Sequence, residues 1–198
     1  MVKLTKIYTK TGDTGTTGLA GKHRVNKSSE IIRLIGSLDE LNANLGYSIA
    51  LMTDQVNFHP VVTMCQSIQN HLFNIGADIC SVDKSASQPA AISQCDIEIL
   101  ESGIDAMNKT LQPLKSFILP GGNPIAAHMH ITRTVCRRCE LDYWQWLETQ
   151  TKQPDSNITY INRLSDWLFT CCRWLNDQTK VTEPLWQPSY QATEKPVA

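Results

Sequence analysis

The chain has 198 residues, with 18 Lys and Arg against 19 Asp and Glu, which gives a formal net charge of −1. Hydrophobic residues make up 41% of the chain and charged residues 19%. This length allows one or two domains with a substantial core, and this composition is too apolar for a disordered protein. The balanced charge argues against nucleic-acid binding, which requires a surplus of Lys and Arg facing the phosphates.

The N-terminus and the cysteines indicate where the protein works. Met1 to Tyr8 lack the apolar stretch of a secretory signal, and no apolar stretch is long enough to span a bilayer. The seven cysteines are an odd number and lie within apolar patterns, which favours reduced core thiols over a disulfide framework. We therefore expect a cytoplasmic protein without a membrane segment.

The first 29 residues are polar, rich in Gly, Thr and Lys, and lack sustained periodicity. They predict a loop that becomes ordered when it binds a ligand. Beyond them, apolar residues recur at steps of three and four, which is typical of helices that bury one face. Five stretches have this pattern: residues 30–52, 61–79, 97–111, 125–148 and 157–176.

The five predicted helices indicate an all-α fold, a single up-and-down bundle over residues 30–180. No segment has the alternation typical of a strand, and no internal repeat is evident. Residues 117–124 predict a rigid turn before the fourth helix, because their prolines and glycines cannot continue a helix. Residues 181–198 are polar and contain three prolines, so we expect a mobile C-terminal tail.

The first candidate site is the segment Thr9 to Thr17, which reads TKTGDTGTT. Its glycines would let the backbone approach a ligand closely, and its threonines and Lys10 could bind phosphate oxygens. It is no Walker A loop, because the Gly-Lys-Ser/Thr ending is missing. The alternative is a flexible N-terminal arm. Lys22, His23, Arg24 and Lys27 would add charge to the same site or be solvated.

The second candidate is a polar stripe on the fourth predicted helix. At about 100° per residue, Arg133, Arg137, Glu140 and Trp144 share one face, and Arg138 points away from it. Two arginines one turn apart repel each other unless anions lie nearby, so the stripe calls for a carboxylate partner or a phosphate ligand. The alternative is a solvated face with an internal pair between Arg137 and Glu140.

Two further sets of residues complete the candidates. A polar ribbon on the fifth predicted helix contains Asn162, Asp166 and Arg173. Its asparagine could bind a hydroxyl pair and its aspartate could orient an arginine, and the alternative is a network on the helix surface. Asp39, in the apolar pattern of the first helix, is either the counter-ion of the arginine stripe or an ordinary solvent-facing charge.

Several kinds of site are excluded by spacing. Cys136-x-x-Cys139 lacks a second ligand pair at zinc-finger spacing, and the Glu-x-x-His repeats of a di-iron bundle are missing. His128 and His130 are two residues apart and face different directions on a helix. No protein-bound metal site is therefore predicted.

Five sequence blocks in order resemble the PduO-type ATP:cob(I)alamin adenosyltransferases. The blocks are KIYTKTGD (residues 6–13), GSLDELN (36–42), FILPGG (117–122), RTVCRRCE (133–140) and YINRLSD (160–166). The resemblance implies a ferritin-like five-helix bundle with a nucleotide-binding N-terminal loop, assembled as a homotrimer with active sites between subunits. It implies transfer of the 5′-deoxyadenosyl group of ATP to the cobalt of cob(I)alamin, which gives adenosylcobalamin and triphosphate.

The resemblance also implies roles for individual residues. Phe117 matches an aromatic residue on the lower axial side of the corrin, and Asp39 and Arg133 match a salt bridge across the subunit interface. Asn162 matches a ribose or nucleotide contact. The remaining ATP contacts carry over to the N-terminal loop and the fourth helix: Thr9, Lys10, Thr11, Gly12, Thr17 and Lys27, with Arg137, Arg138 and Glu140.

The implied chemistry explains why no paired acid and base is present. Cob(I)alamin is itself a strong nucleophile, so the protein has to align the reactants and neutralise the triphosphate, a task for Lys10, Lys27, Arg137 and Mg²⁺. A reductase and an adenosylcobalamin-dependent client enzyme are the expected partners. Two alternatives stay open: a non-catalytic trimer that senses or delivers adenosylcobalamin, and a purely structural bundle.

Overall fold

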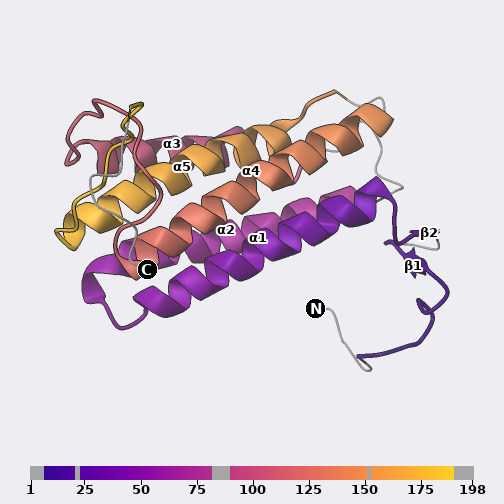
Figure 1. Ribbon diagram of the computed structural model, residues 1–198. Helices are drawn as coiled ribbons and strands as arrows, with labels where there is room; N and C mark the ends of the chain where they lie inside the picture. The colour runs from indigo at the N-terminus through magenta and orange to yellow at the C-terminus, as the bar shows by residue number, and fades with distance from the viewer. Residues whose placement is uncertain (1–6, 21–22, 82–89, 151–152, 190–198) are drawn as a thin grey trace.

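The computed structural model describes residues 7–20, 23–81, 90–150 and 153–189. Figure 1 shows a bundle in which α4 packs against α1 and α5, α1 packs against α2, and α3 lies along α5. The helices are α1 (Glu30–Met52), η1 (Val56–Phe58), α2 (His59–Cys80), α3 (Gln94–Asn108), α4 (Pro124–Gln150) and α5 (Ser156–Gln178). The predicted all-α, five-helix fold is confirmed.

The bundle forms because each helix buries the apolar stripe that its sequence predicts. On α1, Leu34, Leu38, Leu41 and Leu45 are at most 3% exposed and face the same core. Full burial of one such side chain stabilises the fold by roughly 1.5–3 kcal/mol. No helix among the described residues is long and apolar enough to cross a membrane.

Most of the cysteines belong to this core, as predicted. All seven are free thiols, and five of them are buried: Cys65, Cys136, Cys139, Cys171 and Cys172. Burial raises the pKa of the Cys65 thiol to about 12, and burial is also the largest cause that raises the pKa of Cys139 to about 12. These thiols therefore stay protonated and serve as small apolar side chains.

A tight turn fixes the start of α4. The Asn123 side chain accepts hydrogen bonds from the Ile125 and Ala126 backbone amides at 2.9 and 3.0 Å and so caps the helix. Gly122 has φ +110°, and a Cβ at this position would lie 2.1 Å from Asn176 Oδ1. Only glycine fits, and the turn holds the preceding segment against the end of α5.

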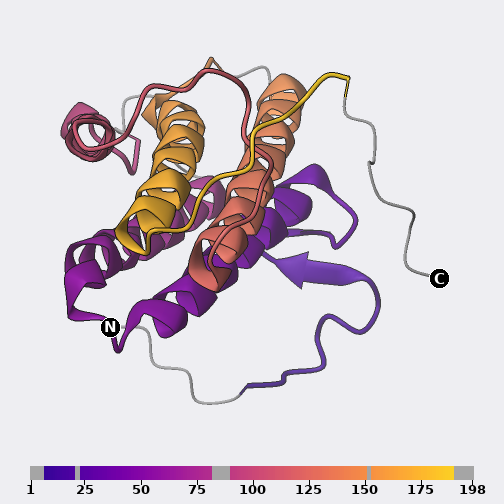
Figure 2. The same ribbon diagram turned by 60° about the vertical axis from the view of Figure 1, so that its left-hand side comes forward.

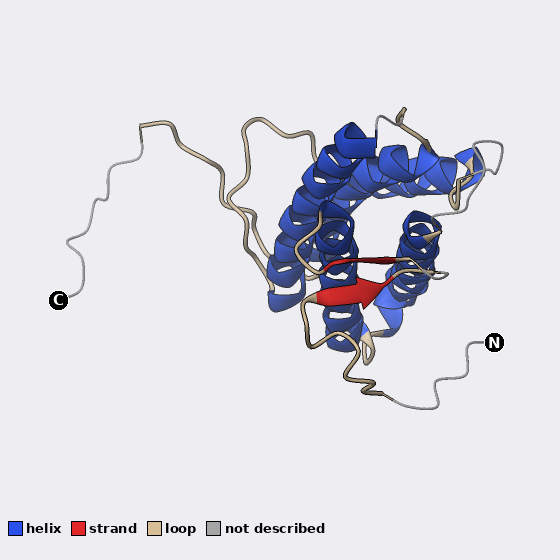
Figure 3. Cartoon of the chain, turned by 90° about the vertical axis from the view of Figure 1, so that its right-hand side faces the viewer, coloured by secondary structure: helices blue, strands red, loops and turns tan. Residues whose placement is uncertain are grey.

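Two regions differ from the sequence expectations. Within the N-terminal segment, β1 (Thr16–Gly18) and β2 (Arg24–Asn26) form an antiparallel hairpin that lies at one end of the bundle (Figure 3). Strands of three residues are too short to produce a recognisable alternation, which explains why no strand was predicted. The hairpin is the one sheet in the described part of the chain.

The first part of the predicted C-terminal tail also has a defined place. After α5 the chain runs back beside the segment that precedes α4, and Ile118 and Leu185 form an antiparallel bridge (Figure 2). The two backbones satisfy each other's hydrogen bonds there, which a scan of local polarity cannot detect. The expectation of a mobile tail is therefore wrong for this stretch, and residues 190–198 lie outside the described residues.

Candidate nucleotide and corrinoid site

The N-terminal loop curls so that a lysine lies against a glycine. Backbone bonds from Asp13 to Lys10 and from Gly15 to Gly12 close two successive turns, at 3.4 and 3.2 Å. The Lys27 ammonium lies 3.0 Å from the point that a Cβ on Gly12 would occupy. The missing side chain of Gly12 thus leaves room for Lys27, and the loop combines a close backbone approach with a positive charge, as phosphate binding requires.

Arg24 braces this loop. Its Nη2 donates to the Thr11 carbonyl at 2.7 Å, to the Thr16 carbonyl at 3.1 Å and to Thr16 Oγ1 at 2.9 Å. The sequence indicated Arg24 only as one of several nearby positive charges. Its guanidinium instead joins β2 to the start of the loop, because its donors can serve several acceptors at once.

The other predicted loop residues are open to solvent or nearly so. Thr9 and Thr11 are exposed and their hydroxyls lie 3.0 Å apart, while Thr17 is half-buried in β1. Lys10 has φ +59°, the left-handed region in which a non-glycine residue is uncommon. The loop therefore presents Thr9, Lys10 and Thr11 outward, where a nucleotide can reach them.

On α4, Arg137 is exposed and makes no hydrogen bond or ion pair with any described residue. The alternative of an internal pair between Arg137 and Glu140 is therefore wrong. Arg138 is held by an ion pair with Glu40 on α1, and this hydrogen bond raises the pKa of the Arg138 guanidinium. The two neighbouring arginines thus differ, since Arg137 keeps its donors for a ligand.

Arg133 and Asp39 are not brought together within the chain. Arg133 is half-buried and its Nε has no hydrogen-bond partner in the described part of the structure. Asp39 is exposed, has no partner among the same residues, and lies at a cavity of about 450 Å³ between α1 and α2. Each group therefore lacks the counter-ion that the sequence reasoning expected.

The polar ribbon predicted on α5 is divided among different partners. Asn162 is exposed and has no partner among the described residues. Asp166 is paired with Arg163 at 3.0 Å, and Arg163 also reaches Glu101 on α3 at 2.9 Å. Arg173 is buried and turns toward the segments that flank α3 and α5. The three residues do not form one ribbon, and the pair between Asp166 and Arg163 fits the alternative of a surface network. Of the three, Asn162 alone has no partner in the described part of the chain.

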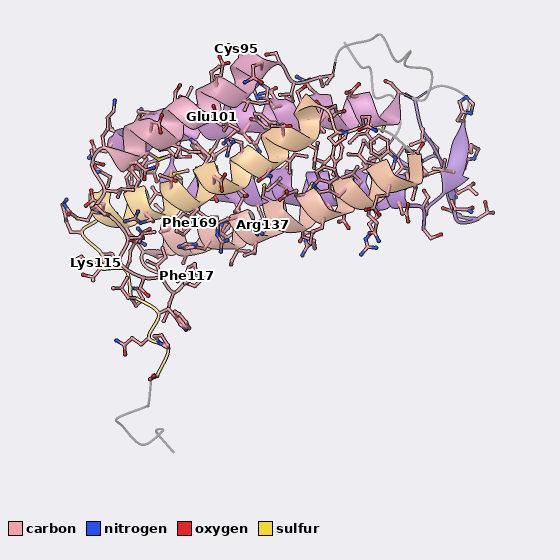
Figure 4. All side chains as sticks on the ribbon, turned by 90° about the horizontal axis from the view of Figure 1, so that it is seen from above. Cys95, Glu101, Lys115, Phe117, Arg137 and Phe169 are labelled. Carbon is pink, nitrogen blue, oxygen red and sulfur yellow. The ribbon has the colours of Figure 1, made fainter. Side chains whose placement is uncertain are left out.

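Phe117 lies outside the bundle core. Its side chain is 78% exposed, and its ring packs edge-on against Trp186 with 6.1 Å between the ring centroids. Figure 4 shows Phe117 beside the C-terminal segment, with Arg137 farther along α4. An aromatic ring that is mostly exposed contributes little to the core and leaves a flat apolar surface for a ligand.

His130 is a buried polar residue to which the sequence analysis assigned no place in the core or the site. It is 3% exposed on α4, neither ring nitrogen has a partner among the described residues, and its ring lies 6.4 Å from that of Phe169. Burial, with a smaller effect of the Arg133 charge, lowers the pKa of His130 to about 4. A neutral imidazole therefore lies beside the partly unsatisfied Arg133. A lone histidine in an apolar pattern carries no signal that distinguishes it from an ordinary core residue.

Comparisons with known proteins show which family the chain belongs to. The family model for cobalamin adenosyltransferases matches residues 7–175, which is most of the chain. The chain belongs to the cobalamin adenosyltransferase family. This confirms the resemblance found in the sequence and, with it, the predicted enzyme class.

Relatives of the same family match the chain over nearly its whole length. A corrinoid adenosyltransferase of Mycobacterium tuberculosis is 39% identical over 97% of this chain and 98% of its own. One from Bacillus subtilis is 35% identical over 89% of each chain. A solved variant of the PduO-type ATP:corrinoid adenosyltransferase from Lactobacillus reuteri, complexed with cobalamin and ATP, is 30% identical with a TM-score of 0.83 and covers 92% of this chain and 99% of its own.

Proposed function

We propose that this chain transfers the 5′-deoxyadenosyl group of ATP to the cobalt of a reduced corrinoid and releases triphosphate. The observation that carries the proposal is Arg137, an exposed arginine without a partner among the described residues, in a family whose reaction expels a highly charged anion. The similar Lactobacillus reuteri enzyme was solved with both cobalamin and ATP, which supports the same two substrates here.

The proposed reaction is a nucleophilic displacement. The cob(I)alamin cobalt supplies an electron pair to the 5′ carbon of ATP, a cobalt–carbon bond forms, and the bond from that carbon to the triphosphate oxygen breaks. The triphosphate leaves with the electron pair of the broken bond. No proton has to be abstracted, so the chain contributes alignment and charge.

We assign the nucleotide to the N-terminal loop and the exposed side of α4. Lys10, Lys27 and Arg137 would neutralise the triphosphate as it leaves, because charged groups placed in advance stabilise developing negative charge. Thr9, Thr11, Gly12 and Thr17 would hold phosphate oxygens through hydroxyl and backbone groups, and Asn162 would bind the ribose. Arg138 and Glu140 are nucleotide contacts that the family resemblance implies; Arg138 would bind the nucleotide with the donors that its pair with Glu40 leaves available.

Mg²⁺ would be held mainly by the nucleotide. No group of three His, Cys, Asp or Glu side chains that could hold a metal ion occurs in the described part of the chain. Mg²⁺ commonly keeps several waters and binds substrate phosphates with only one or two carboxylates, so this arrangement fits the ion. It would add positive charge at the triphosphate.

We assign the lower face of the corrin to Phe117. Its exposed ring offers cobalt no ligand atom and would exclude water from that face. With fewer axial donors, Co(II) gains an electron more readily, so the reactive Co(I) state becomes accessible.

A second copy of the chain would complete each site. Asp39 and Arg133 both lack a partner among the described residues of one chain, and a buried guanidinium nitrogen without an acceptor is costly. Pairing of Asp39 with Arg133 of a neighbouring copy would satisfy both groups and bring substrate-binding elements together. A homotrimer is the assembly that we propose.

The proposed cellular setting follows from the reaction. A reductase would supply the electron for Co(I), a client enzyme that uses adenosylcobalamin would receive the product, and the cytoplasm would be the compartment.

The test is turnover. Purified protein, ATP and chemically reduced cob(I)alamin should yield adenosylcobalamin and triphosphate in equal amounts. Binding of ATP and corrinoid without triphosphate release would contradict catalysis and favour the non-catalytic sensor or delivery protein. Absence of both binding and turnover would favour the structural bundle.

A further inference from the structure

Two segments that are distant in the sequence lie side by side next to α5. We call residues 116–119 the lip and residues 183–186 the strap. The Leu119 amide donates to the Pro184 carbonyl at 2.8 Å, and the Trp186 amide donates to the Phe117 carbonyl at 2.7 Å. Ser116 Oγ donates to the Trp186 carbonyl at 3.0 Å. The strap therefore contacts Phe117 through its backbone and, by the edge-on Trp186 ring, through its side chain.

Packing alone does not hold the lip and the strap in place. Phe117 is 78% exposed, and Leu119, Leu185 and Trp186 are 45–48% exposed, so much of the apolar area of both segments stays in contact with solvent. Ordering two such segments costs conformational entropy that this small burial cannot offset. Their placement has to come from directed polar contacts.

A buried arginine supplies such a contact. Arg173 on α5 is 8% exposed, and its Nη2 donates to the Gln112 carbonyl at 2.7 Å. Its Nε donates to Glu183 Oε2 at 3.2 Å. One planar guanidinium thus ties the segment that leads into the lip and the first residue of the strap to the same point on the bundle.

The contact also fixes how the strap is aligned with the lip. Glu183 directly precedes Pro184, whose carbonyl accepts the bond from Leu119. A shift of the strap by one residue would exchange the sides on which its carbonyls and side chains lie, which would break both backbone bonds and turn Trp186 away from Phe117. Such a shift would also separate Glu183 from Arg173, and leaving a guanidinium unpaired in the core is costly in free energy.

We infer that Arg173 and Glu183 are positioning residues that align the strap with the lip and thereby hold the Phe117 ring against the corrinoid. This inference rests on the proposed function for its last step, the contact of Phe117 with corrinoid. The alignment itself is a property of the protein without substrate. Arg173 and Glu183 act through Phe117 and touch neither ATP nor cobalt.

The first experiment measures the alignment without any substrate. Hydrogen exchange of the full-length protein, followed by mass spectrometry, reports on peptides that contain the lip and the strap. Glu183→Ala should raise exchange in both segments about tenfold, because the opening free energy of the pair falls when its acceptor is removed. Glu183→Gln, which keeps an oxygen acceptor, should have a smaller effect. Glu101→Ala is the matched control, since it breaks an arginine–glutamate pair between α3 and α5 and should leave both segments unchanged.

The second experiment measures what the alignment does for the reaction. Glu183→Ala should lower kcat per folded molecule about tenfold while KM for ATP stays within about twofold, because the substrate-facing ring is misplaced in a bundle that is still folded. Tm should fall by several degrees as well, because Arg173 loses its acceptor, so kcat is measured well below the Tm of the variant. Arg173→Lys keeps the charge but cannot span both acceptors, and it should reproduce this pattern. In a Phe117→Ala background, Glu183→Ala should have no further effect on kcat, since its path to the substrate is already lost.

Unchanged exchange in both Glu183→Ala and Arg173→Lys would overturn the alignment. Independent, multiplying losses of kcat for Glu183→Ala and Phe117→Ala would overturn the route through Phe117. If the wild-type protein binds its substrates but performs no transfer, the proposed function fails and the exchange experiment alone decides the role of Arg173 and Glu183.

Discussion

The bundle interior and its rim are ordered by different forces. The rim comprises the N-terminal loop, the lip, the strap and the residues of the proposed site on α1 and α4. Leu34, Leu41 and Ile68 in the interior are fully buried, whereas Tyr8 in the N-terminal loop and Phe117 in the lip are 68% and 78% exposed. Apolar burial holds the interior together, whereas polar contacts from single arginines hold the rim. Arg24 braces the loop and Arg173 ties down the strap. We therefore expect stability and the proposed chemistry to depend on separate residues, which substitutions can disrupt separately.

The largest effect on stability is expected inside the bundle. Ile68→Ala on α2 removes a side chain that is fully buried. It should lower the free energy of unfolding by about 2–5 kcal/mol, because the surrounding core cannot close the cavity completely. Chemical denaturation measures this loss. The activity per folded molecule should be unchanged, and a matching loss of kcat would contradict the separation of interior and rim.

A rim residue should show the opposite pattern. Arg137→Ala should leave Tm unchanged because Arg137 is exposed. Its kcat/KM for ATP should fall by a factor that corresponds to about 1.5–3 kcal/mol of lost transition-state stabilisation, the value of one charged contact. Steady-state kinetics measure the loss, and Lys109→Ala, an exposed cation at the end of α3, is the control. Normal use of ATP by a folded Arg137→Ala protein would remove Arg137 from the site.

Substitutions of Asp39 and Arg133 test whether a second copy of the chain supplies the missing partner of each residue. The coupling free energy in a double-mutant cycle of Asp39→Asn and Arg133→Met should be about 0.5–3 kcal/mol, read from the stability of the assembly by sedimentation. Wild-type protein should sediment as a trimer, and each single variant should dissociate more readily. Strictly additive effects would show that the two groups do not meet.

The N-terminal loop should respond to nucleotide when the bundle does not. Residues 7–20 and 23–29 are mostly exposed and bury too little apolar area to be strongly protected alone. Hydrogen exchange in this stretch should slow when ATP is added, whereas exchange in the core of α1 should not change. Equal exchange in the loop with and without ATP would mean that it is a preformed element.

Phe117→Ala should have only a small effect on stability. A core position would lose about 3–5 kcal/mol, but this exposed ring should lose no more than about 0.5 kcal/mol. The variant should bind ATP, turn over slowly and show less four-coordinate Co(II) in its absorption spectrum. Chemically pre-reduced Co(I) should restore part of the rate. Early melting with an unchanged spectrum would assign Phe117 to the fold alone.

The helices could be predicted from the sequence because their signal is local. A stripe of apolar residues at steps of three and four appears within any one turn and its neighbours, so α1, α2, α4 and α5 lie close to their predicted ranges. The residue types of the site were recognisable for the same reason. Gly12 among threonines and the charges of Lys10 and Arg137 indicate an anion site before any fold is known.

Only the tertiary structure decided which polar groups meet. Arg138 and Arg137 are neighbours in the sequence, yet Arg138 is bound by Glu40, whereas Arg137 has no partner in the part of the chain that the structure describes. Arg173 was expected to share one polar ribbon with Asn162, but it is buried and turns instead to the Glu183 carboxylate and the Gln112 carbonyl. Local periodicity determines the face of a helix on which an arginine lies. Its partner depends on segments that the chain brings back from far away, and no local pattern encodes that return.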